Sequence, residues 1–434
     1  MMRFSRNRFK RGIHWPLTLF LLWSGSVRAQ VRDSSRSVDL TGSVRLESGQ
    51  ILKGKHLGVD FERQWLQRAF VNLGVTAQRG QRLAIHARAE GKLWYETFPA
   101  EFINDPLDVP ERYFSFYPYR CEGVYSPGDP DRPFLRIGTG YFPFKYNKDV
   151  RNLGEYLFRS GTYPGWLRTE FDFPFAHLAG IRLSSRLFDR LDQHLLFTSE
   201  TEVPPFFDFS LSYIAGYEFG RFLKTGAGVS FDRLVSVDRD KTSPENALTR
   251  YVEDDGDTMY YTFRGTKLMG MVSFDVKRLF RRDGDFAFWG EDDGKLYSEV
   301  AVLGAKNYPG QYDTLAQRIP WMIGFNVPAA RLLDVLNIEV EWYGCKHPNF
   351  IPKINENPTY KSPKNDYLTY SYDGDDWKWS VYAKRTVVEG WSIIGQYAND
   401  HLRTSSSFEQ TKDREEALTR PEHGYWMVKI LYDF

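Results

Sequence analysis

Apolar and polar residues alternate with a period of two along most of this chain. In residues 82–96, Leu83, Ile85 and Ala87 fall on one face of an extended chain, while His86 and Arg88 fall on the other. This alternation predicts β-strands with one apolar and one charged face. Sixteen segments fit this description, and they cover residues 37–46, 68–78, 82–96, 112–124, 134–142, 177–187, 193–200, 208–220, 223–233, 267–277, 296–304, 318–327, 337–344, 377–385, 391–399 and 425–434.

The connections between these segments alternate between long polar stretches and short ones. Near the end of the chain, for example, the long connection 345–376 is followed by the short connection 386–390. Bacterial outer-membrane barrels show this asymmetry, with short periplasmic turns and long surface loops. Two connections fit badly, because 201–207 is short where a loop is due and 278–295 is long where a turn is due. We therefore predict an all-β fold, a transmembrane antiparallel barrel of about 16 strands, within a range of 14 to 18.

The N-terminal residues have the composition of a secretory signal peptide. Five basic residues precede the apolar run "PLTLFLLW", and Val27 and Ala29 supply the small residues expected before a cleavage site. The apolar run is much shorter than the roughly 20 residues that a membrane-spanning helix requires. We expect residues 1–29 to be removed during export and residues 30–434 to form the barrel.

The last ten residues, "YWMVKILYDF", predict a strand that ends on an aromatic residue. This segment resembles the C-terminal assembly signal of Gram-negative outer-membrane proteins, in which a terminal Phe follows alternating apolar residues. The resemblance implies recognition by the barrel-assembly machinery and a place in the bacterial outer membrane, among its lipid and lipopolysaccharide. The residues that carry it are Trp426, Val428, Ile430, Tyr432 and Phe434.

A closed barrel would also explain why the chain finishes on a strand. In lipid every backbone donor and acceptor needs a partner, so the last strand must pair with the first. The alternative is a secreted soluble β-sandwich or solenoid that happens to end on a strand. Such a protein would have little reason to carry apolar stripes opposite charged ones on nearly every strand.

The predicted strand number favours a channel. About eight strands leave an interior filled by side chains, whereas sixteen to eighteen enclose water. Charges that project into this lumen would set its selectivity. Basic residues on one arc of the wall and acidic residues on another predict a transverse field with little preference among small polar solutes. The expected pore-lining residues are Arg45, His86, Arg88, Glu90, Lys92, Glu339 and Glu341.

The third long connection, residues 145–175, mixes charge, aromatic residues and glycine. In its order and length it is similar to the third surface loop of sixteen-stranded general porins, which folds inward and narrows the channel. The resemblance implies a constriction loop with Arg151, Glu155 and Arg159 as the constriction residues, and it also implies a homotrimer. The alternative is that these three are solvated charges on the outer surface.

Composition and charge exclude other classes. The chain has 57 Lys and Arg against 56 Asp and Glu, and removal of residues 1–29 leaves 51 basic against 56 acidic residues. We therefore expect no nucleic-acid partner. The two cysteines, Cys121 and Cys345, are too few for a disulfide scaffold, and we expect lone thiols.

Three acidic turn-like stretches, residues 253–257, 291–294 and 373–376, raise the question of a metal site. None of them continues into the full spacing of an EF-hand loop. We interpret them as flexible acidic turns, the first and third able to bridge lipopolysaccharide weakly through divalent ions, and expect no metal site and no cofactor.

The sequence thus predicts a porin-like channel for passive diffusion of small polar or charged solutes, and not an enzyme. One alternative is a surface adhesin or assembly partner built on a barrel. Another is an outer-membrane hydrolase, for which His401, Ser405 to Ser407 and His423 are the nearest material. The spacing of these residues along the sequence does not identify a nucleophile, a base and an orienting group among them.

Overall fold

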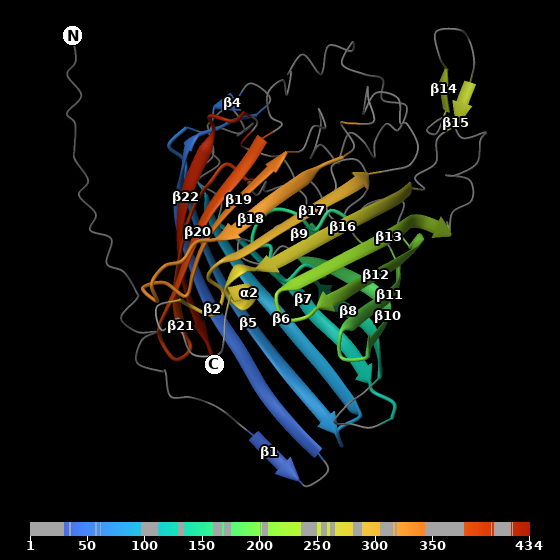
Figure 1. Cartoon of the computed structure of the whole chain (residues 1–434). Helices are drawn as coiled ribbons and strands as arrows, with labels where there is room; N and C mark the ends of the chain where they lie inside the picture. Colours follow the sequence, from blue (N-terminus) through green and yellow to red (C-terminus); the bar gives the residue numbers. More distant parts are fainter. Residues whose placement is uncertain are drawn as a thin grey trace, which may run out of the picture.

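The chain forms a closed antiparallel barrel, shown in Figure 1. The structure is a computed structural model, and it describes residues 30–33, 36–56, 59–60, 62–96, 112–128, 134–158, 167–168, 175–199, 201, 207–235, 250–252, 258–260, 265–280, 289–303, 316, 319–342, 377–400, 402, 418 and 420–434. The predicted signal peptide, residues 1–29, lies outside the described residues.

Sixteen strands make up the barrel wall, which confirms the predicted fold class and strand number. Each of the sixteen segments expected from the sequence corresponds to one of them. The wall strands are β2 (Arg36–Lys53), β5 (Trp65–Arg79), β6 (Leu83–Glu96), β7 (Arg112–Tyr125), β8 (Leu135–Phe144), β10 (Phe175–Leu187), β11 (Leu191–Ser199), β12 (Phe209–Phe219), β13 (Leu223–Val235), β16 (Gly265–Asp275), β17 (Lys295–Leu303), β18 (Trp321–Asn326), β19 (Val335–Trp342), β20 (Trp377–Val388), β21 (Trp391–Ala398) and β22 (Gly424–Asp433).

Short additional strands extend or decorate this wall. In the same sheet, β1 (Gln30–Asp33) pairs with β2 and β9 (Leu167–Arg168) pairs with β10. Two small hairpins lie outside the barrel sheet, one formed by β3 (Lys55–His56) and β4 (Val59–Asp60), the other by β14 (Arg250–Val252) and β15 (Thr258–Tyr260).

The barrel closes where the last strand meets the first long one. Strand β22 pairs antiparallel with β2 in a register that runs from Ser43 opposite Asp433 to Lys53 opposite Gly424. The backbones of Gly42 and Phe434 exchange two hydrogen bonds of 2.9 Å each. A Cβ atom on Gly42 would lie 2.4 Å from the Phe434 ring, so the missing side chain makes room for the terminal aromatic group. The strand at the end of the chain is thus held by closure of the sheet.

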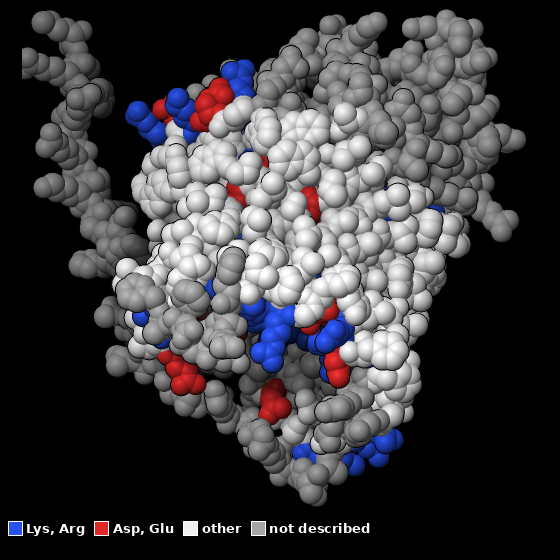
Figure 2. All heavy atoms as spheres, viewed as in Figure 1, with Lys and Arg blue, Asp and Glu red and all other residues white. Residues whose placement is uncertain are grey.

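The two faces of the wall differ as the alternation predicted. At odd positions of β5 and β6, Leu73 and Ile85 are 56% and 53% exposed. At even positions of the same strands, Asn72 and Glu90 are only 5% and 3% exposed. Because the sheet is closed, the exposed apolar residues face outward and the polar ones face the interior. Figure 2 shows a broad band of uncharged side chains over one outer face, with charged residues gathered below it and at its upper left edge. Such a band is typical of a barrel wall in contact with lipid.

The connections separate into two ends. Turns such as 80–82 and 220–222 lie at the end where Phe434 lies, which we call the short-turn end; the long connections lie at the other, the long-connection end (Figure 1). Among the described helices, no segment is long and apolar enough to cross a membrane, a finding that has no bearing on crossing by strands.

The connection 278–295 departs from the sequence expectation. The predicted strand 267–277 ends at Asp275, and the chain continues into a five-residue helix, α2 (Val276–Phe280). Asp275 explains the change, because its carboxylate accepts a 3.2 Å hydrogen bond from the backbone N–H of Arg278, as an N-cap residue does. Lys277 then donates to the carbonyl oxygens of Gly290 and Glu291, at 2.7 and 2.5 Å. Lys277 therefore ties α2 to the described residues at the other end of this connection, and the connection does not alter the strand count.

Changing Phe434 should impair assembly of the barrel. The ring packs over Gly42 and stacks on Tyr432, with ring centroids 5.7 Å apart. A charge at such an outward position costs up to about 2–4 kcal/mol at the middle of a membrane and less near its surfaces. We expect Phe434→Asp to lower the fraction of heat-modifiable barrel on a gel, while Phe434→Tyr keeps it. A normal fraction in Phe434→Asp would show that the terminal aromatic group is dispensable.

Candidate functional site: a loop held inside the barrel

The chain turns into the barrel interior after β8. Residues 145–158 follow the end of this strand, and the side chains of Tyr156, Leu157 and Phe158 are completely buried. They belong to a cluster that joins the loop to inward-facing residues of the wall. The cluster comprises Tyr146, Val150, Leu153, Tyr156, Leu157 and Phe158 of the loop and Phe142, Phe144, Ala176, Leu178, Leu196, Ile214, Met269, Tyr297, Ala301, Leu303 and Met322 of the wall.

Two carboxylates of β19 hold the centre of this loop. Glu339 accepts hydrogen bonds from the backbone N–H groups of Arg151, Asn152 and Leu153, at 2.6, 2.8 and 3.0 Å. Glu341 accepts one from the N–H of Gly154 at 3.3 Å and one from the hydroxyl of Tyr156 at 2.9 Å. Both carboxylates are fully buried, with 0% of each residue exposed. Consecutive N–H groups that converge on a carboxylate form strong, charge-assisted hydrogen bonds.

A third carboxylate, Glu299 of β17, holds both ends of the same segment. It accepts hydrogen bonds from the hydroxyl of Tyr146 at 2.5 Å, from the side-chain amide of Asn147 at 3.0 Å and from the backbone N–H of Tyr156 at 2.9 Å. Because Tyr146 precedes the loop turn and Tyr156 follows it, one side chain fixes both flanks. The loop is thus attached to the wall mainly through its backbone.

The loop also folds on itself around Glu155. The Glu155 carboxylate accepts hydrogen bonds from the backbone N–H groups of Asn147 at 2.6 Å and of Tyr146 at 3.4 Å. Its backbone has a φ of +60°, next to Gly154 at +82°, so the turn uses two successive left-handed residues. Burial raises the pKa of the Glu155 carboxyl well above its usual range, and the nearby charge of Glu299 raises it further. Glu155 is therefore an internal support of the loop.

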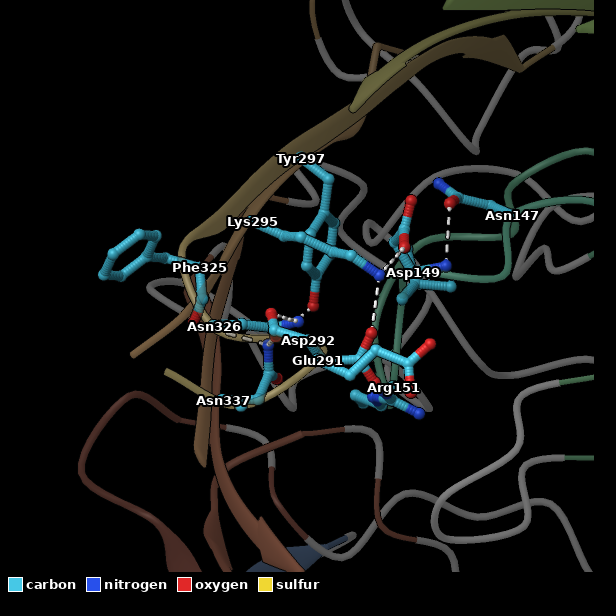
Figure 3. Close-up of polar contacts among 12 residues, drawn as sticks. Asn147, Asp149, Arg151, Glu291, Asp292, Lys295, Tyr297, Phe325, Asn326 and Asn337 are labelled. Atoms are coloured by element: carbon cyan, nitrogen blue, oxygen red, sulfur yellow. Dashed lines mark hydrogen bonds and ion pairs between the residues drawn. The ribbon is translucent and has the colours of Figure 1, made fainter. Parts of the chain in front are cut away.

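Ion pairs hold the loop near the start of β17 (Figure 3). Lys295 lies 3.7 Å from the carboxylate of Asp149 and 2.5 Å from that of Asp292, and Arg151 lies 3.4 Å from Asp292. Burial acts to raise the pKa of Asp292, but the hydrogen bond and charge of Lys295 hold it below the usual value. Since Asp292 belongs to the long turn that contains α2, this turn contributes to the position of the loop.

Tyr297 reaches Glu339 through the space left by a glycine of the strand between them. Its hydroxyl donates to Glu339 at 2.6 Å, and a Cβ atom on its strand partner Gly324 would lie 2.2 Å from the Tyr297 ring. Gly324 therefore leaves the space through which Tyr297 reaches across β18 to β19. The same hydroxyl accepts a 2.7 Å hydrogen bond from Asn337.

Filling this space should loosen the loop. In Gly324→Val the Tyr297 ring must move, and Glu339 loses a hydrogen bond of a kind worth about 1.5–3 kcal/mol for a charged acceptor. We expect faster hydrogen exchange in peptides that cover residues 146–158, by roughly tenfold or more. Gly395→Ala is the matched control, because a Cβ atom there meets nothing within 4 Å. Unchanged exchange in Gly324→Val would mean that Tyr297 is not needed to position Glu339.

Basic side chains gather on the wall across β6 to β10. Arg120 of β7 and Arg182 of β10 both pair with the buried carboxylate of Glu122, each at 2.6 Å. The pair with Arg182 reaches across β8, where a Cβ atom on Gly138 would lie 2.5 Å from Glu122. Arg88 is the strand partner of Arg120 and donates to Thr41 at 3.0 Å. Two guanidinium groups therefore pair with one carboxylate and Arg88 adds a third positive charge on the neighbouring strand, which leaves this part of the wall positively charged.

The other residues expected on this arc also belong to the interior face. Arg45 lies 3.0 Å from the Glu47 carboxylate. The hydroxyl of Thr76 and Nδ1 of His86 are 3.1 Å apart. Glu90 accepts hydrogen bonds from Asn72, at 3.3 Å, and from the hydroxyl of Tyr117. Arg45 and Lys92 both lie over the ring of Phe70, at 3.9 and 5.1 Å from its centroid.

Glu339 and Glu341 project inward as expected, but they do not face open water. The sequence interpretation set them against the basic arc as charges that attract cations across the lumen. The loop covers both carboxylates and its N–H groups satisfy them. Their role is therefore to bind the loop, and not to attract cations in the lumen as expected. The sequence of β19 alone gives no information about a loop that packs against it.

Of the three constriction residues expected from the sequence, the two that the structure describes make different contacts. Arg151 approaches Asp292 with its side chain and Glu339 with its backbone N–H, while Glu155 is buried within the loop. Arg159 lies outside the described residues. Sequence reasoning missed the anchors Glu299 and Tyr297 and the basic wall residues Arg120 and Arg182. Glu299 and Arg182 are charged residues within predicted strands, which was the one signal that could have found them, but the sequence did not show their contacts.

The described residues add little to the hydrolase alternative. His423 is buried, and its backbone N–H donates to the carbonyl of Arg420 at 3.0 Å. His401 and Ser405 to Ser407 lie outside the described part of the chain. Within that part, no group of three His, Cys, Asp or Glu side chains is placed to hold a metal ion.

Comparison with solved structures supports the architecture. OprB of Pseudomonas putida aligns with 92% of this chain and 94% of its own chain, with a TM-score of 0.54 and 11% sequence identity. The chain has the fold of bacterial porins. A triple mutant of the Rhodopseudomonas blastica porin also aligns, over 92% of this chain and 100% of its own, with a TM-score of 0.44 and 9% identity. No family model and no curated protein sequence matches this porin-like chain.

Proposed function

We propose that this porin-like barrel is an outer-membrane channel through which small polar or charged solutes diffuse passively. The observation that carries the proposal is the loop 145–158, which is fixed to one side of the interior by Glu299, Glu339 and Glu341. A loop fixed against the wall narrows a lumen without filling it. A barrel whose interior served only packing would need no such attachment.

The uneven charge of the wall supports a preference for anions. On the loop side, the loop covers the buried carboxylates, which accept its N–H groups and so do not line the lumen directly. On the other side, Arg120 and Arg182 share the single carboxylate of Glu122, and Arg88 lies on the neighbouring strand as the partner of Arg120. Fixed charges that line a narrow path select solutes of the opposite sign. This revises the weak, balanced field that the sequence predicted.

Uptake into liposomes tests the proposal. Purified barrel in vesicles should admit small uncharged sugars, and it should admit small carboxylates faster than organic cations of similar size. Vesicles that contain heat-denatured protein give the background rate. Equal rates with native and denatured protein would refute the channel, whereas equal rates for anions and cations would refute only the charge preference.

A further inference from the structure

Described residues of a second connection are buried in the interior at the long-connection end. Residues Asn399, Asp400, Leu402 and Leu418 belong to the connection between β21 and β22, and all four are buried. Leu402 and Leu418 pack with residues whose parity places them on the inner face of the wall. We call this group the mouth cluster; it comprises Ile51, Leu66, Ala398, Leu402, Leu418, Tyr425 and Met427.

The mouth cluster lies near the long-connection end of the barrel. Ile51 is near the end of β2, Leu66 is at the start of β5, and Tyr425 is at the start of β22. All these positions are far from the short turns and from Phe434. Leu402 and Leu418 thus occupy interior space near the mouth that would otherwise hold water, and each is exposed by no more than 2%.

Polar contacts fix both flanks of this connection. On the first flank, Asp400 accepts hydrogen bonds from the hydroxyl of Tyr425 at 2.8 Å and from the side-chain amide of Gln396 at 2.7 Å. On the second, Nζ of the buried Lys378 donates to the carbonyl oxygen of Leu418 at 2.5 Å. The two flanks are tied together, because the side-chain amide of Asn399 donates to the carbonyl of Arg420 at 2.9 Å.

The same kind of attachment serves the loop 145–158. There, Nζ of the buried Lys267 donates to the carbonyl oxygen of Leu157 at 3.2 Å. Lys378 is also the direct cross-strand partner of Glu341, which holds Gly154 and Tyr156. The anchors of the two inserted segments therefore lie side by side on β19 and β20.

We infer that the mouth cluster forms a second narrowing of the channel, separate from the loop 145–158, and that Lys378 and Leu418 help to set the size of solute that enters. The inference rests on the proposed channel function. The two segments are held from neighbouring strands, so each takes up a different part of the interior cross-section. Each narrowing then excludes solutes on its own.

Two variants test the inference in the full-length protein. Lys378→Met removes the ammonium group that holds the Leu418 carbonyl, and Leu418→Ala removes apolar contact while it leaves Lys378 in place. Lys384→Met is the control, because this lysine projects from the same strand with the same parity and is not part of the cluster. Uncharged sugars of increasing size are the probes, since their uptake does not depend on the charge that the variants remove.

We expect both variants to take up the largest admitted sugars at least about twofold faster than the wild type, with little change for the smallest. We also expect faster hydrogen exchange in peptides that cover residues 399–402 and 418–423. Lys384→Met should change neither quantity. Faster exchange with unchanged uptake in a conducting wild type would refute the narrowing, and unchanged exchange would refute the anchoring itself.

Measured together, sugar uptake and hydrogen exchange distinguish a failure of the second narrowing from a failure of the proposed channel function. If the wild type admits no sugar, the proposed function fails and the narrowing fails with it, whatever the exchange shows. If the wild type admits sugars but the variants match it, only the second narrowing fails.

Discussion

Replacing Glu339 and Glu341 together by glutamine is expected to raise single-channel conductance and to admit larger solutes. The two carboxylates accept four backbone N–H groups of the loop, from Arg151 to Gly154. Glutamine is neutral and turns an NH₂ group toward some of these donors. Hydrogen bonds to charged groups contribute about 1.5–3 kcal/mol each. A change of about 5.5 kcal/mol moves a two-state equilibrium from 99:1 to 1:99, so the double variant should release the loop.

The control for this variant is Glu90→Gln. Glu90 is also a buried carboxylate of the inner wall, but its hydrogen bonds to described residues come from Asn72 and Tyr117 of the wall. Conductance measured in planar bilayers should rise by roughly a factor of two or more in the double variant, because the narrowest cross-section limits ion flow. It should stay near the wild-type value in Glu90→Gln. An unchanged conductance in the double variant would show that the loop does not limit the channel.

Replacing Arg88 and Lys92 by glutamine is expected to shift the reversal potential toward cation preference. Both side chains belong to the interior face of β6, and Arg88 pairs in register with Arg120. Their loss leaves Glu90 and Glu122 less opposed. The shift should be largest in dilute salt, since the screening length is about 10 Å at 0.1 M and about 3 Å at 1 M.

Arg88→Lys with Lys92→Arg keeps both charges and serves as the control for the selectivity measurement. It should leave the reversal potential near that of the wild type. Replacing Arg88 and Lys92 by glutamine should change the conductance less than replacing Glu339 and Glu341 does. The first change alters the charge of the channel wall, whereas the second alters the width of the channel. A reversal potential that does not move in dilute salt would place Arg88 and Lys92 outside the permeation path.

The strands could be predicted from sequence because a closed barrel with an apolar outer face imposes one pattern on every strand. Period-two alternation in residues 82–96 reflects the exposed outer face on one side and the interior on the other. The terminal Phe434 could be predicted to be held, since closure requires the last strand to pair. Helix α2 escaped prediction because its cap, Asp275, continues the alternation of the strand before it.

The site could be predicted only in outline. Residues 145–175 were expected to fold inward from resemblance in order and length, and residues 145–158 do so. The hydrogen bonds between this loop and the three wall carboxylates join residues more than 140 positions apart, such as Tyr156 and Glu299. No local pattern encodes such pairs. For the same reason Glu339 was expected to face water, and the connection between β21 and β22 gave no sign that Leu402 and Leu418 are buried.

The most direct test of the account is a recording of current through the purified wild-type barrel in a planar bilayer. Folded, heat-modifiable protein should insert to give discrete current steps of one main size, because each barrel contributes one channel of fixed width. In a salt gradient the sign of the reversal potential should report a preference for anions. Folded protein that inserts into the bilayer and carries no current would contradict the channel, and it would favour a barrel whose long connections bind another molecule.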